Sequence, residues 1–410
     1  MTAPVFGQQF SRPQDEPTPV IGADFSKILI IDTSADASNV EFAYDTPVRF
    51  STSDTDAVAA LGTGALKDAV RGIHDQLTGL NAGADVTVVR VEQEETNAET
   101  SAHIVDILNS LPEIPSAVNA TPRIVVAGLT AWRANLDTVN PVVAALQGNI
   151  GKILAIAPVD VDPTSAANAI DARESMSSER LIPIGVGAKV YEGASLVTRP
   201  MAPRVAGLFV RVDNENGGYP FDPIANRPIY GLAGLSRKIP FSMLDGSTEG
   251  QQMLAGNVSI VTEGEVGVDG AISDGGFVFI GTDNAQTGEL WEQFHQVRGT
   301  DYIVTELMQI TRQFLGRKIT ADMVEAWINS IAFRLRDHKA ADRILGYTPA
   351  HEMFRADRNS PENIRLGSLT LNIGIEPAPA FKLANHEIRR YRPAVEGLVQ
   401  EIIARLSSVI

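Results

Sequence analysis

The fold class of this chain is decided by residues 123–160, "RIVVAGLTAWRANLDTVNPVVAALQGNIGKILAIAPVD". The opening RIVVAGL is an apolar run of the length of a buried strand, and NPVVAALQGNI has the pattern of a helix. A second apolar run, KILAIAPVD, predicts another strand. Strand, helix and strand in this order indicate an α/β layer with a largely parallel sheet.

The same alternation continues on both sides of this stretch. Towards the amino terminus, KILIID (27–32) and DVTVVRVE (85–92) predict strands, and a helical zone from Thr55 to Leu80 lies between them. Three more elements follow the pattern: a helix over 104–111, a helix over 165–176 and a strand over 181–187. The sequence therefore predicts an α/β region through the first half of the chain.

A further helix is expected in "PRVAGLFVRVDNENGGYPFDPIANRPIYGL", residues 203–232. Its apolar positions Val205, Leu208, Phe209 and Val212 recur at helical spacing, and Pro203 suits a first turn. A strand with Leu208, Val210 and Val212 on one face would leave Phe209 on the polar face, so the helix is favoured. Asn216 and Gly217 predict a left-handed end. The loop at 214–226 has either a ligand-binding role or a purely structural one.

Beyond Leu232 the alternation of strands and helices gives way to short β-like runs separated by glycine-rich turns. VSIVTEG and GGFVFIGT predict short strands there. Two helices are expected after Gly299. Ile303, Leu307, Ile310 and Phe314 line the first; Met323, Trp327, Ile331 and Leu335 line the second, which Thr320 caps. These rows are expected to be core faces, with Trp327 packed inside rather than binding a cofactor.

The carboxyl-terminal part is predicted to be a strand, an extended piece and a helix. Leu369, Leu371, Ile373 and Ile375 alternate on one face until Pro377 and Pro379 end the strand. An extended piece then reaches Arg392. An amphipathic terminal helix follows, with apolar positions Val395, Leu398, Val399, Ile402, Ile403 and Leu406.

Composition restricts the class of function. A chain of 410 residues exceeds the size at which one core usually stops growing, so two or three domains are expected. Its formal charge of −16 disfavours nucleic acid as a direct partner. It contains no cysteine, which excludes disulfides and thiolate-ligated metals.

The amino-terminal segment, MTAPVFGQQFSRPQDEPTPVIGADF, lacks the charged and apolar regions of a secretory signal. No apolar run reaches the ~18 residues of a membrane span, so no membrane insertion is expected. Because the segment is polar and rich in proline, it is predicted to be an extended arm.

The sequence offers no catalytic, cofactor-binding or metal-binding residue, and no cofactor is expected. Its 6 histidines are scattered without an H-x-x-x-H pair, and neither a G-x-S-x-G nor a Walker loop occurs. One enzymatic alternative stays open at this stage. An open α/β sheet permits a cytosolic enzyme that binds a nucleotide or sugar ligand at the carboxyl-terminal edge of its strands.

The linear order of features resembles the sheath protein of contractile phage tails, of the temperate-myophage type, which is related to the sheaths of other contractile injection systems. The resemblance spans most of the chain and rests on four passages. They are TPVRFSTSDTDAVAALGTGALKDAVRGIHDQL followed by VTVVRVEQ, AGLFVRVDNENGGYPFDPIAN, GRKITADMVEAWINSIAFRLRDHKAADRILGYTPAHE, and LTLNIGIEPAPAFKLANHEI. The second is similar to the family's A-G-x-x-A-R-x-D passage: Asp213 and Gly218 keep their places, whereas Tyr219 stands where the family often has Trp.

The resemblance implies a mixed α/β (α+β) sheath fold with a core domain of mixed sheet flanked by helices. Its expected parts are an extended arm (1–25), a discontinuous core domain (26–54 with 232–376), an inserted outward-facing α/β region (55–231) and a carboxyl-terminal arm strand and helix (377–410). The loop at 214–226 is then expected to be architecture near subunit contacts.

The resemblance also implies a structural protein, not an enzyme. Such subunits form stacked rings around an inner tail tube and contract once to drive the tube through the target cell envelope. Expected partners are other copies of the chain, the tube protein, and baseplate and tail terminator proteins. The expected location is the virion, in the phage tail, after assembly in the cytoplasm of the bacterial host.

Two groups of interface residues are predicted. Terminal arms in this family donate strands to neighbouring subunits, which implies contacts by Pro4, Val5, Phe6, Phe10, Val20, Phe381, Leu383, His386, Ile388 and Arg390. The second group is a basic cluster that would face an acidic surface of the tube: Arg334, Arg336, Lys339 and Arg343. A solvated helix face is the alternative interpretation of that cluster.

Overall fold

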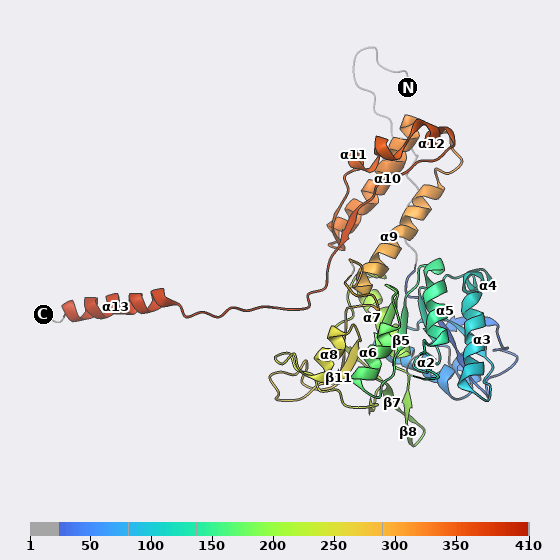
Figure 1. The fold of residues 1–410 in the computed structure, drawn as a ribbon, viewed down its shortest axis with the longest axis horizontal. Helices are drawn as coiled ribbons and strands as arrows, with labels where there is room; N and C mark the ends of the chain where they lie inside the picture. Colours follow the sequence, from blue (N-terminus) through green and yellow to red (C-terminus); the bar gives the residue numbers. More distant parts are fainter. Residues whose placement is uncertain (1–23, 81, 136–137, 289, 409–410) are drawn as a thin grey trace, which may run out of the picture. The chain divides into compact units, whose positions relative to one another are not determined.

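The computed structural model of the chain describes residues 24–80, 82–135, 138–288 and 290–408. The chain divides into two compact units, Met1–Pro379 and Ala380–Ile410. The first unit contains two apolar cores, one in an α/β region and one around a pair of long helices. Figure 1 shows the helices and strands of the chain, coloured along the sequence.

The α/β region is built on a parallel sheet. Strand β1 (Ile28–Thr33) lies between β3 (Asp85–Val91) and β4 (Ile124–Ala127) and runs parallel to both. Strand β2 (Pro47–Ser51) pairs antiparallel with the outer side of β3. The apolar side chains of β1, β3 and β4 are buried, as expected for strands that are covered on both faces.

The parallel arrangement continues past β4. Strands β5 (Ala157–Asp160) and β6 (Leu181–Ile184) pair in parallel. Isolated parallel bridges join Ile124 to Ile156 and Ile184 to Ser259. The strands predicted from residues 123–160 and 181–187 are thereby confirmed, although β5 begins later than expected because Ile150–Ile153 form a 3₁₀ helix that ends at Leu154 in the left-handed region.

Helices cover both faces of this sheet. On one face α2 (Ala65–Asp75) contacts β1 and α7 (Ala202–Glu215), and α7 also contacts β4 and β5. On the other, α3 (Asn97–Asn109) contacts β1, β3 and α5 (Pro141–Asn149). The remaining helices here are α1 (Thr55–Ala60), α4 (Ile114–Val118), α6 (Ala166–Glu174), α8 (Glu249–Ala255) and the 3₁₀ turn Leu111–Glu113. The predicted helical zone 55–80 is interrupted at Gly62 and Gly64, which both have positive φ.

The predicted helix beginning at Pro203 is confirmed as α7. Residues 202–213 are all buried, and Pro203 lies in the first turn. Gly217 and Gly218 follow the helix with φ of 69° and 86°, which only glycine adopts readily. The Gly218 N–H donates to the Asp213 carbonyl at 2.7 Å and closes the helix end.

Two small antiparallel sheets complete the α/β region. One orders β10 (Gly234–Leu235), β7 (Ala188–Glu192) and β8 (Ser195–Arg199), the last two forming a hairpin. The other orders β11 (Ile260–Glu263), β12 (Phe277–Ile280) and β9 (Arg227–Ile229). The β11 and β12 pairing confirms the short strands expected in VSIVTEG and GGFVFIGT.

The second core lies around helices α9 (Phe294–Arg312) and α10 (Ala321–Ala340), which run side by side in Figure 1. The predicted start of α9 after Gly299 is wrong: the helix begins at Phe294, because its first turns carry polar residues that the apolar pattern does not reveal. Trp327 packs in the second core as predicted, and its indole N–H donates to Thr311 Oγ1 at 3.1 Å.

The strand predicted over Leu369–Ile375 is mostly wrong. Only β14 (Ile375–Pro377) is a strand, and it pairs antiparallel with β13 (Ile344–Tyr347). Upstream of β14 the contacts are isolated: a single bridge joins Phe354 to Leu371, and the side-chain amide of Asn359 donates to the Thr370 carbonyl and accepts from the Thr370 N–H. Short helices α11 (Ala350–Met353), α12 (Pro361–Arg365) and the 3₁₀ turn Ala356–Arg358 lie between β13 and β14 in sequence.

The second unit consists of a segment without regular structure and helix α13 (Arg392–Ser407), which confirms the predicted terminal helix. Its apolar stripe is exposed: Val395 61%, Leu398 53%, Val399 47%, Ile402 47%, Ile403 55% and Leu406 68%. In proteins most helical stability comes from packing of an apolar face, and this 16-residue helix buries none of its residues.

The predicted domain bounds stay a prediction. Within one chain, β1 from the expected core segment 26–54 is a central strand of the sheet that also contains β3 and β4 from the expected insertion 55–231. The second core instead gathers Phe25 and Phe221 with residues from 302 to 375. The first core is therefore formed by side chains between Ile28 and Phe294, whereas Phe25 and Phe221 pack with the long helices in the second core.

Candidate functional site

The candidate site is the junction at which the first turns of α9 meet α7. Helix α7 is held at its start by Asp160, whose carboxylate accepts from the N–H groups of Met201 and Ala202. Burial raises the pKa of Asp160 to about 6, and these hydrogen bonds only partly oppose that rise. The carboxylate at the end of β5 therefore positions a helix, with its oxygens already occupied.

A buried ion pair joins the other end of α7 to α9. Arg298 donates to both oxygens of Asp213, at 2.9 and 2.6 Å, and each side chain is only 1% exposed. Burial raises the pKa of Asp213, while Arg298 and the Ser26 hydroxyl oppose that rise. Removing one partner of such a pair would leave the other charge buried and alone, which is costly.

The same pair holds the beginning of the described chain. Ser26 Oγ donates to Asp213 at 3.1 Å, and Arg298 Nη2 donates to the Phe25 carbonyl at 3.0 Å. The Phe25 ring packs edge-on against Tyr302 at 5.4 Å, with the Arg123 guanidinium 4.8 Å from its centroid. We call Phe25 and Ser26 the amino-terminal root.

The last residues of the first unit are bound by the first turn of α9. His295 Nε2 donates to the Ala378 carbonyl at 3.1 Å, and Gln296 Nε2 donates to the Pro377 carbonyl at 3.3 Å. Both side chains are buried. We call Pro377 and Ala378 the carboxyl-terminal root. Both roots therefore contact the same helix.

A second buried polar cluster lies further along α9. Glu306 accepts from His338 Nε2 at 2.6 Å and from Arg334, and both Glu306 and His338 are fully buried. Burial raises the pKa of Glu306, but hydrogen bonds from His338 and Arg334 outweigh it and hold that pKa below its usual value. The cluster joins α9 to α10.

This geometry places part of the predicted basic cluster in internal contacts. Arg334 binds Glu306, and the Arg343 guanidinium lies 3.3 Å from the centroid of the Tyr219 ring. Arg336 and Lys339 are exposed. Which of these side chains faces a tube stays a prediction.

The predicted arm contacts divide into two groups. Pro4, Val5, Phe6, Phe10 and Val20 lie outside the described residues. Phe381, Leu383, His386, Ile388 and Arg390 are all exposed, with Ile388 at 94% and Phe381 at 86%. Apolar side chains this exposed are suited to contact another molecule, but their role stays a prediction.

Sequence reasoning singled out Asp213 but missed its partner Arg298 and the neighbouring His295 and Gln296. A signal was present in the pattern. Arg298 falls four residues after Phe294 and four before Tyr302, so it lies on the apolar face of α9. A charged residue on a core face needs a buried partner, and Asp213 in a buried helix was the available carboxylate.

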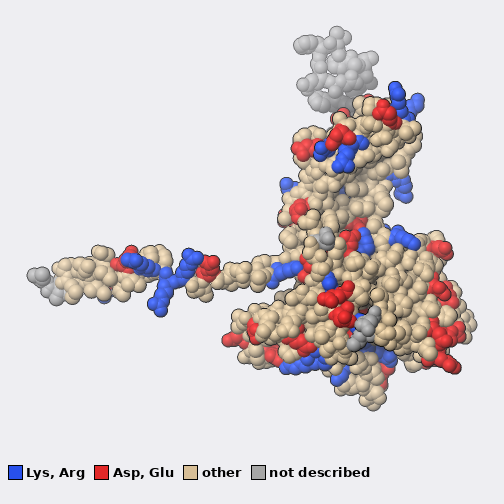
Figure 2. Space-filling view, in the orientation of Figure 1, with Lys and Arg blue, Asp and Glu red and all other residues tan. Residues whose placement is uncertain are grey.

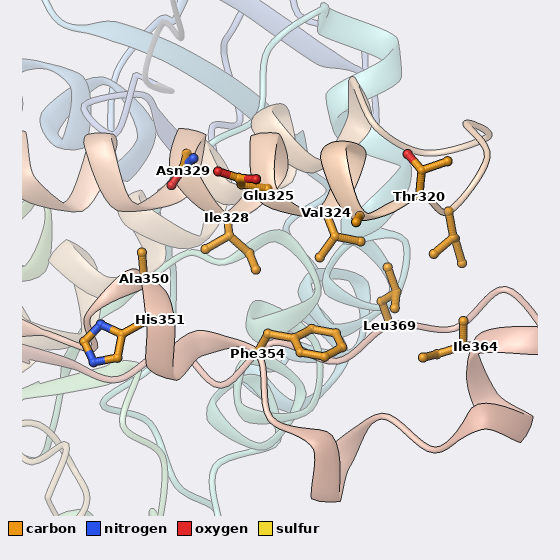
Figure 3. A pocket seen from close by; sticks show the side chains of 12 residues that line it. Thr320, Val324, Glu325, Ile328, Asn329, Ala350, His351, Phe354, Ile364 and Leu369 are labelled. Carbon is orange, nitrogen blue, oxygen red and sulfur yellow. The ribbon is translucent and has the colours of Figure 1, made fainter.

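The surface offers an open groove of about 690 Å³ beside α10 (Figure 3). Val324 and Ile328 of α10 face Phe354 and Leu369 across it, and its lining is mainly apolar. Within the described ranges no group of three or more His, Asp or Glu side chains could hold a metal ion. The helices in the same ranges include none of the length and apolarity that crossing a bilayer requires.

Comparison with known proteins places this geometry in context. The chain is 27% identical over 351 residues, 82% of its length and 84% of the relative's, to a Pseudomonas aeruginosa (strain UCBPP-PA14) protein assigned as a prophage major tail sheath protein. No family model matches the chain.

Solved structures share the fold across nearly the whole chain. The helical sheath of the anti-feeding prophage in its contracted state matches with a TM-score of 0.67 and 14% identity, covering 94% of this chain and 100% of that one. The contracted PVC sheath of an extracellular contractile injection system matches with a TM-score of 0.66 and 12% identity, covering 95% and 99%. A chain of the anti-feeding prophage baseplate also matches, with a TM-score of 0.66, 12% identity and coverage of 95% and 100%.

These relatives are structural components of phage tails or contractile particles, not enzymes. The enzymatic alternative left open by the sequence is therefore not retained. The chain is thus similar in sequence to a prophage major tail sheath protein, and it shares the fold of solved contractile sheath structures.

Proposed function

We propose that the chain polymerises as stacked rings around an inner tail tube and contracts to drive the tube through the target cell envelope. Other copies of the chain, the tube, and baseplate and tail terminator proteins are its proposed partners. Assembly in the cytoplasm of a bacterial host is part of the same proposal. The proposal also includes the domain arrangement. Residues 26–54 with 232–376 form the core domain, and residues 55–231 form an inserted region that faces outward.

The observation that carries the proposal is the sheet of β13 and β14, which has two strands among the described residues. Two-stranded sheets are marginal by themselves, and their outer edges have unpaired N–H and C=O groups. Strands contributed by other copies would complete the ladder. Because β14 ends at Pro377, in the carboxyl-terminal root, a segment leaving this sheet could pair with the same sheet in a neighbour.

Charge supports contacts between copies. Residues 380–392 contain Lys382, Arg389, Arg390 and Arg392 against the single acidic Glu387, in a chain of net charge −16. Figure 2 shows basic side chains gathered on the segment before α13. A basic segment on an acidic chain is complementary to the surface of another copy. Arg336 and Lys339 remain the proposed contacts with an acidic tube.

Deleting Met1–Asp24 tests the proposal. Each ladder hydrogen bond contributes about 0.5 to 1.5 kcal/mol, so a single arm binds weakly and only repetition through a lattice makes the assembly tight. The truncated chain is expected to keep the circular dichroism spectrum of the intact chain, and to sediment as small species under conditions in which the intact chain forms tubes visible by electron microscopy.

A matched control removes residues 1–12 alone and leaves residues 13–24 in place. Intermediate tube formation by this control would locate the contact more finely. Tubes formed by the full deletion as readily as by the intact chain would contradict strand exchange through the amino-terminal arm. Small closed oligomers of the intact chain under every condition would contradict polymerisation itself.

A further inference from the structure

Both roots of the folded unit are held by adjacent side chains of a single helix. Arg298 binds the Phe25 carbonyl, which lies 273 residues away in sequence, and His295 and Gln296 bind carbonyls 83 and 81 residues away. His295 and Arg298 are separated by less than one helical turn, about 4.5 Å along the axis. Two chain segments from opposite ends of the sequence thus meet on one short stretch of α9.

The position of that stretch depends on tertiary contacts. The helix begins after Gln293, which makes no side-chain cap. Phe294 is fully buried and packs edge-on against Phe209 of α7 at 5.6 Å, while the Arg298 guanidinium lies 4.7 Å from the same ring. The first turn is held by the packing of Phe294, by the Asp213–Arg298 ion pair and by a hydrogen bond from the Phe294 N–H to the Thr282 carbonyl at 3.1 Å.

We propose that residues 294–302 are a common anchor that couples the two roots within one subunit. A load on one terminal segment then passes to the other through two turns of α9, in addition to any path through β1, which begins at Ile28 directly after the amino-terminal root. Arg298, His295 and Gln296 are the positioning residues of this anchor. The mechanical meaning of the coupling rests on the proposed function, in which neighbouring copies bind the terminal segments, but the coupling itself is a property of the single chain.

Hydrogen–deuterium exchange on the unassembled full-length chain tests the coupling. In Arg298→Met, exchange at residues 25–27 is expected to rise at least tenfold, because this root loses its direct hydrogen bond. The decisive readout is the other root: exchange at Ile375, Glu376 and Ala378 is expected to rise at least threefold, because the first turn of α9 loses its ion pair. Gln296→Leu is the reciprocal variant, and it is expected to raise exchange at residues 25–27 at least twofold.

The matched control is Asp68→Asn. Asp68 and Arg204 form another buried ion pair, with hydrogen bonds of 2.8 and 3.1 Å, but this pair joins α2 to α7 and contacts neither root. The control is expected to lower the melting temperature and to leave exchange at both roots unchanged relative to neighbouring amides. If it accelerated both roots as strongly as Arg298→Met, general destabilisation would explain the effect and the proposal would be overturned.

An increase confined to residues 25–27 in Arg298→Met would mean two independent contacts and would also overturn the proposal. Asp213→Asn guards against misfolding of Arg298→Met, because it keeps the size of the side chain and removes its charge; it is expected to affect both roots in the same direction. Tube formation by the intact chain is scored separately by electron microscopy. Coupled roots without tubes would reject the proposed function alone, and tubes with uncoupled roots would reject the anchor alone.

Discussion

At the scale of single residues, the α/β region contains carboxyl groups whose charged form is destabilised by burial. Asp32 ends the buried part of β1, and its carboxylate accepts from the Thr33 N–H at 2.8 Å. Burial raises the pKa of Asp32 to about 6, more than this hydrogen bond lowers it. An acid whose pKa is higher in the folded state stabilises the fold when it is neutral. That contribution is present below about pH 4 and is lost as the pH rises through 6.

Asp32→Asn is therefore expected to stabilise the protein at neutral and alkaline pH. The interval between 3.8 and about 6 corresponds to about 3 kcal/mol at most. The difference in unfolding free energy between variant and parent should grow from about pH 4 to about pH 6 and level off above that pH. Denaturant titrations across this range measure it, and a difference that stays constant with pH would contradict the assignment.

Asp36→Asn is the matched control with the opposite sign. Hydrogen bonds from the Thr63 N–H and hydroxyl hold the pKa of Asp36 below its usual value. Its contribution to stability is therefore present above its unfolded pKa and lost as the pH falls. The control is expected to be less stable than the parent at neutral pH and to approach it in acid.

At the scale of elements, α2 and α7 approach each other closely at Gly207. A Cβ on Gly207 would lie 2.7 Å from the backbone oxygen of Ile73, so a larger residue forces the two helices apart. Gly207→Ala is expected to lower the unfolding free energy by about 1 to 3 kcal/mol, the usual cost of overpacking. Thermal and denaturant unfolding measure the change.

Gly148→Ala in α5 provides the comparison. Nothing lies within 4 Å of a Cβ at this position, and α5 is a helix of the same unit. Alanine is expected to stabilise the helix there by about 0.5 to 1 kcal/mol. Equal losses at both positions would mean that the α2 and α7 contact does not limit residue 207.

These elements also show what the sequence could and could not predict. The period of Val205, Leu208, Phe209 and Val212 was enough to place α7, because one uninterrupted apolar face buries the helix. The same rule missed the first turns of α9, where His295 and Arg298 are buried by pairing rather than by apolarity. It also predicted a strand at Leu369–Ile375, where an isolated Phe354–Leu371 bridge and the side-chain amide of Asn359 hold the chain instead of a continuous ladder. The spacing of apolar residues within one segment cannot predict polar contacts with residues far away in the sequence.

At the scale of the whole molecule, the apolar cores and the exposed apolar side chains of the carboxyl-terminal segment lie in different units. Neither apolar core includes a residue beyond Ile375. The exposed stripe of α13 and the exposed side chains between 381 and 391 belong to the second unit. The two units therefore differ in what they bury: the first buries its own cores, and the apolar surface of the second is open to another molecule.

Truncation after Pro379 is expected to leave the melting temperature of the first unit unchanged within about 2 °C, because both cores remain complete. The same truncation is expected to abolish tube formation. Calorimetry and electron microscopy of the truncated chain measure the two effects. A fall in melting temperature of about 5 °C or more would show that residues 380–410 contribute to the core of their own chain.

The contact between Arg298 and Phe25 also has a consequence for synthesis on the ribosome. The two residues are separated by 273 positions, so the amino-terminal root cannot be docked until α9 has been translated and has left the exit tunnel. A nascent chain therefore emerges with an undocked amino end, and that end reaches its place only when about three quarters of the protein exists. Unfinished chains that end before α9 consequently lack the contact between Arg298 and Phe25.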